Sequence, residues 1–228
     1  TTIIDHHASP SFIRGSLEQM DLPVWVAALE SARLEGLALR EVDLSAQRWL
    51  WDAQSLREMR AVYTPTASGW SARLEGVGAQ GQLSFIEGRL TARLQRLELD
   101  TLPLAEPADV AARTAEPGTA RGEPANPLDW PALSLSSDKL LLSGADYGAL
   151  VLNTSKTGLG QSVDTLSLAG GVLEGSAVGD WQRAGGQSSA KLKFDLSSRD
   201  MASVLRSLGF TPNLSAHYRD TELRVKAV

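Results

Sequence analysis

The sequence predicts a mainly β protein, built as an elongated, curved antiparallel β-sheet with two short amphipathic helices. Three observations support this fold class. Many short segments alternate apolar and polar side chains, glycine and polar pairs separate these segments, and only two segments have helical spacing. Successive side chains on a strand point to opposite faces, so this alternation predicts strands with one buried face and one wet face.

Alternating segments occur throughout the second half of the chain and at the end of the first. The segment 190–196 (AKLKFDL) places Leu192, Phe194 and Leu196 on one side and charged residues on the other. Alternation or apolar β-type runs also predict strands at 89–100, 139–142, 149–153, 165–168 and 223–227. Turn residues between them favour hairpins, which join strands into a meandering antiparallel sheet.

Helical spacing predicts helices at about 21–34 and about 200–208. The first of these segments begins with an aspartate, a residue type that caps helix N-termini. Its residues Leu22, Trp25 and Leu29 share one side. We expect this side to pack on the apolar face of the sheet and to mark a boundary between units.

A proline-rich segment at 101–131 divides the chain. It holds six of the ten prolines, a density that is incompatible with helix interiors and central strands. We therefore predict a loop or linker there, a first β unit at 1–100 and a second at 132–228. Similar patterns in the two units, such as ARLEG at 72–76 and LSLAG at 166–170, indicate an internal repeat.

The composition argues against several classes of function. The chain of 228 residues carries 27 acidic and 22 basic residues, so it has no basic excess with which to neutralise nucleic-acid phosphates. It has no cysteine, which excludes thiolate catalysis and disulfides. The longest stretch without polar side chains is 22–29, whereas a membrane helix needs about twenty residues. We expect no nucleic-acid partner, no membrane span and no signal peptide in this chain.

One segment, 76–81 (GVGAQG), matches the GxGxxG pattern of dinucleotide-binding folds. That site needs a buried parallel strand before the glycines and a helix after them. Arg73 and Glu75 place two charges in the preceding strand, and Gly88 weakens the following helix. We therefore interpret these glycines as hairpin residues.

Other chemical motifs are weak, and we expect no metal and no cofactor. His6 and His7 are adjacent, so on a strand they would face opposite sides and could not hold one metal ion together. The GxSxG nucleophile motif is absent. A pair of glycosidase carboxylates stays possible, because such pairs form in space rather than in sequence. Trp49, Trp51 and Trp70 fit either core packing or an apolar lining for a ligand.

Three longer stretches carry a resemblance to a known family. They are DWPALSLSSDKLLLSGADYGALVLN at 129–153 and VDTLSLAGGVLEGSAVGDWQRAGG at 163–186, followed by AKLKFDLSSRDMASVLRSLGF at 190–210. With them, the chain resembles the AsmA-like proteins of the Gram-negative envelope, and most closely the YhdP family. Members of that family are longer and carry an N-terminal membrane helix, so we expect this chain to be an internal or C-terminal fragment.

The resemblance implies a sheet of β-groove repeats with an apolar trough along its concave side. It implies a non-catalytic segment that binds phospholipid and helps to move phospholipids between the inner and outer membranes. The expected location is the periplasm, with the full-length protein anchored to the inner membrane. The family offers no catalytic residues to carry over, and the sequence identifies no other envelope protein as a partner.

A lipid path must shield acyl chains, whose exposure to water costs about 0.8 kcal/mol per CH₂, without binding one lipid tightly. Aliphatic strand faces suit this task because hydrophobic attraction is non-directional. The candidate lipid-binding residues therefore lie on the apolar stripes of the strands. In the first unit they are Met59, Ala61, Leu74, Leu83, Phe85, Leu90 and Leu94, and in the second they are Leu150, Leu152, Leu166, Leu168, Leu192 and Phe194.

Three alternatives remain open from the residues alone. The same apolar residues could form a sealed core, because strand alternation is identical in both cases. The chain could be a structural or adaptor β-repeat module that binds a protein partner through exposed strand edges. It could also be a β-rich carbohydrate-active enzyme.

Overall fold

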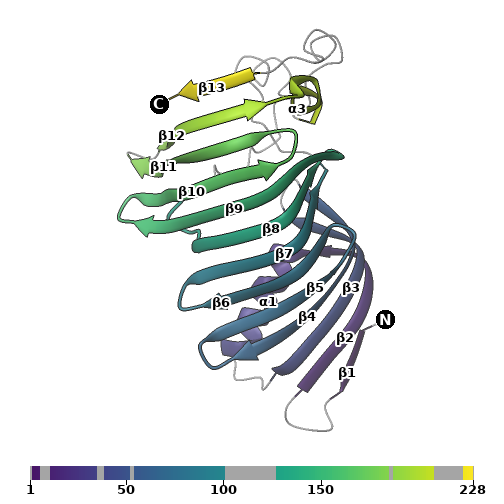
Figure 1. Ribbon diagram of the computed structural model, residues 1–228. Helices are drawn as coiled ribbons and strands as arrows, with labels where there is room; N and C mark the ends of the chain where they lie inside the picture. The colour runs from purple at the N-terminus through teal and green to yellow at the C-terminus, as the bar shows by residue number, and fades with distance from the viewer. Residues whose placement is uncertain are drawn as a thin grey trace, which may run out of the picture.

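The computed structural model describes residues 2–5, 11–34, 39–51, 54–100, 127–184, 187–207 and 223–227. These residues form one sheet of thirteen strands, in which each strand pairs with its neighbours in sequence (Figure 1). The strands are β1 (Thr2–Asp5), β2 (Ser11–Asp21), β3 (Leu39–Trp51), β4 (Gln54–Thr66), β5 (Gly69–Gly76), β6 (Ala79–Ile86), β7 (Arg89–Leu99), β8 (Ala132–Leu142), β9 (Ala145–Thr157), β10 (Gly160–Gly170), β11 (Glu174–Ala184), β12 (Gln187–Ser198) and β13 (Leu223–Ala227).

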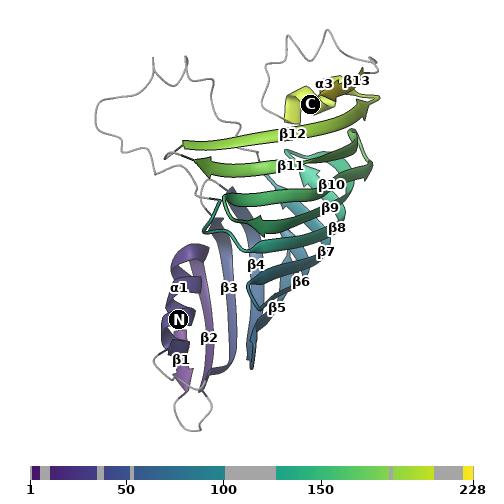
Figure 2. The same cartoon turned by 90° about the vertical axis from the view of Figure 1, so that its left-hand side faces the viewer.

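The predicted mainly β class is confirmed, and all six predicted strand segments fall essentially within β7, β8, β9, β10, β12 and β13. The sheet is open and strongly twisted along its length (Figure 2). Antiparallel pairing, expected throughout, holds for all neighbouring strands of the described residues except two pairs. The pairs β2–β3 and β7–β8 are parallel. In each pair the second strand starts at the same edge of the sheet as the first, so a crossover and not a hairpin joins the two strands.

The helices are α1 (Leu22–Leu34) and α3 (Met201–Ser207), close to the two predicted segments. An aspartate precedes each helix and caps it. The carboxylate of Asp21 accepts a hydrogen bond from the Val24 amide at 3.1 Å, and that of Asp200 accepts one from the Ser203 amide at 2.9 Å. Helix α1 provides the crossover between the parallel strands β2 and β3.

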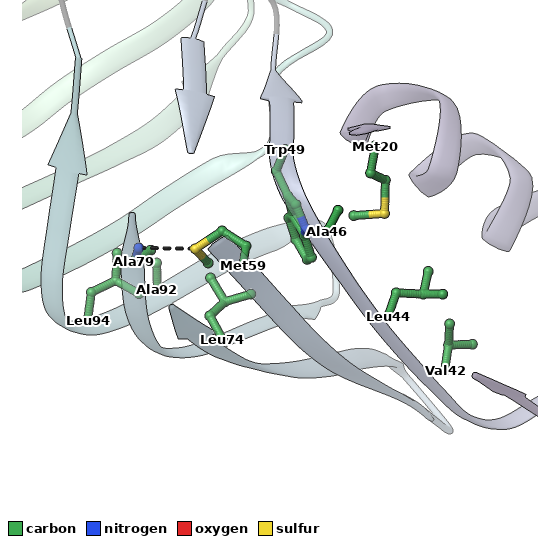
Figure 3. Packing of buried hydrophobic residues seen from close by; sticks show 10 residues of the cluster. All are labelled: Met20, Val42, Leu44, Ala46, Trp49, Met59, Leu74, Ala79, Ala92 and Leu94. Carbon is green, nitrogen blue, oxygen red and sulfur yellow. Dashed lines mark hydrogen bonds between the residues drawn. The ribbon is translucent and has the colours of Figure 1, made fainter. Parts of the chain in front are cut away.

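Two clusters of buried side chains hold the sheet. The larger cluster lies on β2 to β7 and consists of Met20, Val42, Leu44, Ala46, Trp49, Met59, Leu74, Ala79, Ala92 and Leu94 (Figure 3). As predicted, Leu22, Trp25 and Leu29 of α1 pack against it. The smaller cluster, on β8 and β9, consists of Leu140, Leu142, Tyr147 and Leu150.

The glycines of segment 76–81 form a hairpin, as predicted. Gly76 ends β5, and the strand β6 begins at Ala79, so strands lie on both sides of this turn. The Gly78 amide donates to the Arg57 carbonyl at 3.2 Å, and the Gly78 carbonyl accepts from the Glu98 amide at 2.7 Å. The turn therefore links β4 to β7, which brings these two non-adjacent strands together.

Some predictions fall outside the described residues. These are the loop or linker at 101–126 and the histidine pair His6 and His7. Of the proline-rich segment, residues 127–131 are described, and Pro127 is fully buried.

Candidate functional site

The candidate site is one face of the sheet, which we call the apolar face. Strand register aligns the apolar side chains into two adjacent rows that cross ten strands, from β3 to β12. The first row is Leu44, Ala61, Leu74, Gly81, Leu94, Ser137, Leu150, Leu168, Gly175 and Leu196. The second row is Val42, Tyr63, Ala72, Leu83, Ala92, Leu135, Leu152, Leu166, Ala177 and Phe194.

All the candidate lipid-binding residues lie on this face. Nine of them belong to the two rows, and the other four lie on the same side of their strands, two residues from a row residue. Those four are Met59, Phe85, Leu90 and Leu192. The register thus brings together residues that the sequence could assign only to separate strands.

Burial differs between the first half of the apolar face, on β3 to β7, and the second half, on β8 to β12. In the first half, Met59, Leu74 and Leu94 are 1%, 7% and 7% exposed, within the larger cluster. In the second half, Leu152 and Phe194 are only half-buried and Leu192 is 42% exposed. Helix α1 packs on β2 and β3, and the link between β4 and β7 joins the middle of the first half. The three buried residues of this half therefore resemble a core more than an accessible surface.

An aromatic strip on the apolar face joins the candidate residue Phe85 to Trp70 and to Tyr63, which sequence reasoning did not assign to the site. Tyr63 and Trp70 have ring centroids 5.8 Å apart, and Trp70 stacks on Phe85 at 6.1 Å. The sequence had indicated Trp70 only as a residue with two possible roles. Trp49, in contrast, is 4% exposed and belongs to the larger cluster.

The opposite face is polar, and its charges are paired across strands. Arg60 donates two hydrogen bonds of 2.8 Å to Asp43 on the neighbouring strand. These hydrogen bonds lower the pKa of Asp43 and raise that of Arg60. Both side chains therefore stay charged near neutral pH, and this face favours contact with water rather than with acyl chains.

The polar face carries a hollow of about 710 Å³ over β3 to β7. Most of its lining residues, including Arg60, Arg73, Gln82 and Arg93, point away from the apolar face by strand alternation. Polar atoms dominate the lining, so this hollow does not offer an environment for lipid tails.

Within the described part of the chain, no group of three or more His, Asp or Glu side chains could hold a metal ion. No helix among those residues is both long and apolar enough to cross a membrane.

The family model described as "YhdP protein" matches residues 4–226, almost the whole chain. No curated protein and no solved structure matches the chain.

Proposed function

Since this chain belongs to the YhdP family, we propose that it is a non-catalytic, lipid-binding segment of an envelope protein that moves phospholipids between the inner and outer membranes. In this proposal the segment lies in the periplasm, and the full-length protein is anchored to the inner membrane. Acyl chains lie on the apolar face, and headgroups stay in contact with water. The two units at 1–100 and 132–228 act as successive parts of one path.

The observation that carries the proposal is the continuity of the apolar rows across ten strands. A row is apolar at almost every strand that it crosses, with serine or glycine as the exceptions. Each buried CH₂ of an acyl chain gains about 0.8 kcal/mol, wherever on the face it lies. A lipid can therefore shift from one strand to the next without leaving an apolar surface, because the attraction has no preferred direction.

The two halves of the face would contribute differently. Ala61, Leu83, Phe85 and Leu90 are half-buried, and the more deeply buried Met59, Leu74 and Leu94 would shape the floor from below. The second half is the more accessible one. There we expect direct contact with acyl chains at Leu152, Leu166, Leu168, Leu192 and Phe194, whereas Leu150, which is 8% exposed, would lie in the floor like Leu74 and Leu94.

The test is lipid retention by the purified protein, measured by native mass spectrometry and by lipid extraction. We expect phospholipid to co-purify. The variant Leu152→Asp should lower the lipid-bound fraction at least about fivefold, because a carboxylate is costly to bury against acyl chains. The matched control is Val151→Asp, since Val151 is the neighbouring residue, is 37% exposed and faces the polar side.

Thermal unfolding of both variants separates lipid binding from folding. A lipid-free wild-type protein would contradict the proposal and favour the adaptor module. If Leu152→Asp lost its fold while Val151→Asp kept it, Leu152 would belong to a sealed core instead.

A further inference from the structure

A third row lies on the apolar face near the ends of β9, β10 and β11. In it, Lys156 lies directly opposite Gln161, which lies directly opposite Trp181. Lys156 lies four residues beyond Leu152 on the same side of β9, which places it about 13 Å along the strand. This row therefore marks the place where the aliphatic surface gives way to polar and aromatic side chains.

The turn at 127–130 is fixed onto this row. The side-chain amide of Gln161, a buried residue, donates to the Pro127 carbonyl at 3.3 Å and to the Trp130 carbonyl at 2.7 Å. The Lys156 ammonium donates to the Leu128 carbonyl at 3.4 Å. These bonds hold the turn against the ends of the strands, so its side chains have a defined position.

The turn presents apolar groups to solvent. Trp130 is 40% exposed, and its ring meets Trp181 edge-on with centroids 6.1 Å apart. Leu128 is 44% exposed and Leu159, at the tip of the neighbouring hairpin, is 53% exposed. Exposed tryptophan and leucine side chains beside a cation are typical of the zone where a membrane meets water, since tryptophan rings prefer that boundary.

Accessibility on the apolar face increases along β9 towards this row. Leu150 is 8% exposed, Leu152 and Thr154 are half-buried, and Lys156 is exposed. At the other end of the strand, Tyr147 is buried and its hydroxyl hydrogen-bonds to Ser207 of α3. One end of the strand is therefore closed and apolar, and the other is open and positively charged.

A second cation lies on the same side. Arg183 follows Trp181 by two residues on β11, so it projects from the same face. Its amide donates to the Leu159 carbonyl at 2.9 Å, which places Arg183 beside the exposed hairpin tip. The acidic residue of the 127–130 turn is Asp129, so the rim formed by Lys156, Arg183 and this turn has one more positive than negative charge.

We propose that Lys156, Arg183, Trp130 and Trp181 form a subsite for the phosphate headgroup of a phospholipid whose acyl chains lie on the apolar face. This inference rests on the proposed function and adds an orientation to it. Lys156 and Arg183 contact the phosphate oxygens, and the two indole rings lie at the level of the ester linkages. Headgroups then all face the strand ends at Thr157–Gly160, and tails point towards α3.

The experiment compares two lipids that share their acyl chains and differ in the headgroup. Wild-type protein is loaded with dioleoylphosphatidylglycerol or with dioleoylglycerol, which has no phosphate, and the bound fraction is measured by native mass spectrometry. Lys156→Glu combined with Arg183→Glu should lower retention of phosphatidylglycerol about fivefold and leave dioleoylglycerol unchanged, since an exposed ion pair contributes up to about 1 kcal/mol. Lys156→Gln alone should lower the retention of phosphatidylglycerol by a smaller factor and also leave dioleoylglycerol unchanged. The matched control is Lys193→Glu, because Lys193 is exposed and faces the polar side of β12.

The outcomes separate the two proposals. If wild-type protein binds neither lipid, the proposed function fails. If it binds both, and the charge-reversed variant retains phosphatidylglycerol as well as the wild type does, the headgroup subsite is wrong while the lipid surface stands. Displacement of bound phosphatidylglycerol by excess inorganic phosphate would also overturn the subsite, because a free anion would then be its preferred ligand.

Discussion

The sulfur of Met59 on β4 accepts a hydrogen bond from the backbone amide of Ala79 on β6, with the two atoms 3.2 Å apart (Figure 3). Met59 is 1% exposed and Ala79 is also 1% exposed. The contact joins two strands that are not neighbours in the sheet. It lies where the turn after β5 brings β4 close to β7. Met59 therefore both fills the larger cluster and supplies an acceptor for the buried amide of Ala79.

Met59→Ala should therefore destabilise the protein. We expect the free energy of unfolding to fall by about 3 kcal/mol, because the substitution opens a cavity and leaves the Ala79 amide without its acceptor. Chemical denaturation followed by circular dichroism measures this. Leu192→Ala is the comparison: its side chain is 42% exposed, and we expect a loss below about 1 kcal/mol. Equal losses would contradict the expectation that Met59 contributes more to stability than Leu192.

Gly148 allows β9 to approach its neighbour β10 closely. Its φ is +70°, and a Cβ built there would lie 2.1 Å from the Ala169 carbonyl oxygen. We expect Gly148→Ala to lower the free energy of unfolding by about 3 kcal/mol, from backbone strain together with displacement of β10. Gly144→Ala is the matched control, since its φ is +78° and a Cβ there would meet nothing within 4 Å.

The difference in the free energy of unfolding between these two variants measures the cost of the clash with β10, because both variants share the cost of an alanine in the left-handed region. We expect Gly144→Ala to cost about 1 kcal/mol. Denaturation curves of the two proteins provide the comparison. If both variants lost the same stability, the contact with Ala169 would have no energetic role.

Asp200 should make the attachment of α3 depend on pH. Its pKa lies below the ordinary value, because the Ser203 hydroxyl and amide both donate to its carboxylate. A carboxylate with a lowered pKa in the folded state contributes stability above its unfolded pKa of about 3.9, and this contribution disappears as the pH falls through the lower folded value.

Thermal unfolding of wild type and Asp200→Ala across pH tests this. We expect the wild type to be the more stable protein near neutral pH, and the difference to vanish once the pH falls below the folded pKa of Asp200. The substitution also removes the N-cap of α3, which is typically worth about 1 kcal/mol at neutral pH. A difference that stayed constant from pH 7 to acid would mean that the charge of Asp200 has no part in holding the helix.

Much of the candidate site could be predicted because strand alternation is a local property. The residues Leu150 and Leu152 are two apart in sequence, so they share a face whatever else the chain does, and the same holds for Leu166 and Leu168. The helices were also predictable, since the apolar spacing and the capping aspartates lie within a few residues of each other. The hairpin pairing of most neighbouring strands followed from the short turns between them, whereas the parallel pairs β2–β3 and β7–β8 were not predicted.

Alternation did not reveal which of these residues are accessible. Met59 and Leu192 show the same pattern in sequence, yet one is buried and the other is 42% exposed. The difference depends on α1 and on the link between β4 and β7, which are contacts between segments distant in sequence. The polar hollow under Arg73 and Arg93 was likewise unpredicted, because it depends on the curvature of the sheet and not on any one strand.

The sequence by itself determined that this protein is a sheet with one apolar and one polar face, since the two-residue period of a strand is set by the backbone alone. Only the tertiary structure decided how the strands align into continuous rows, where the rows are closed, and where they end. Trp130 and Trp181 lie far apart in sequence and meet at the rim because Gln161 binds the turn that carries Trp130. Contacts of this kind depend on register and on the twist of the whole sheet, which no short stretch of residues contains.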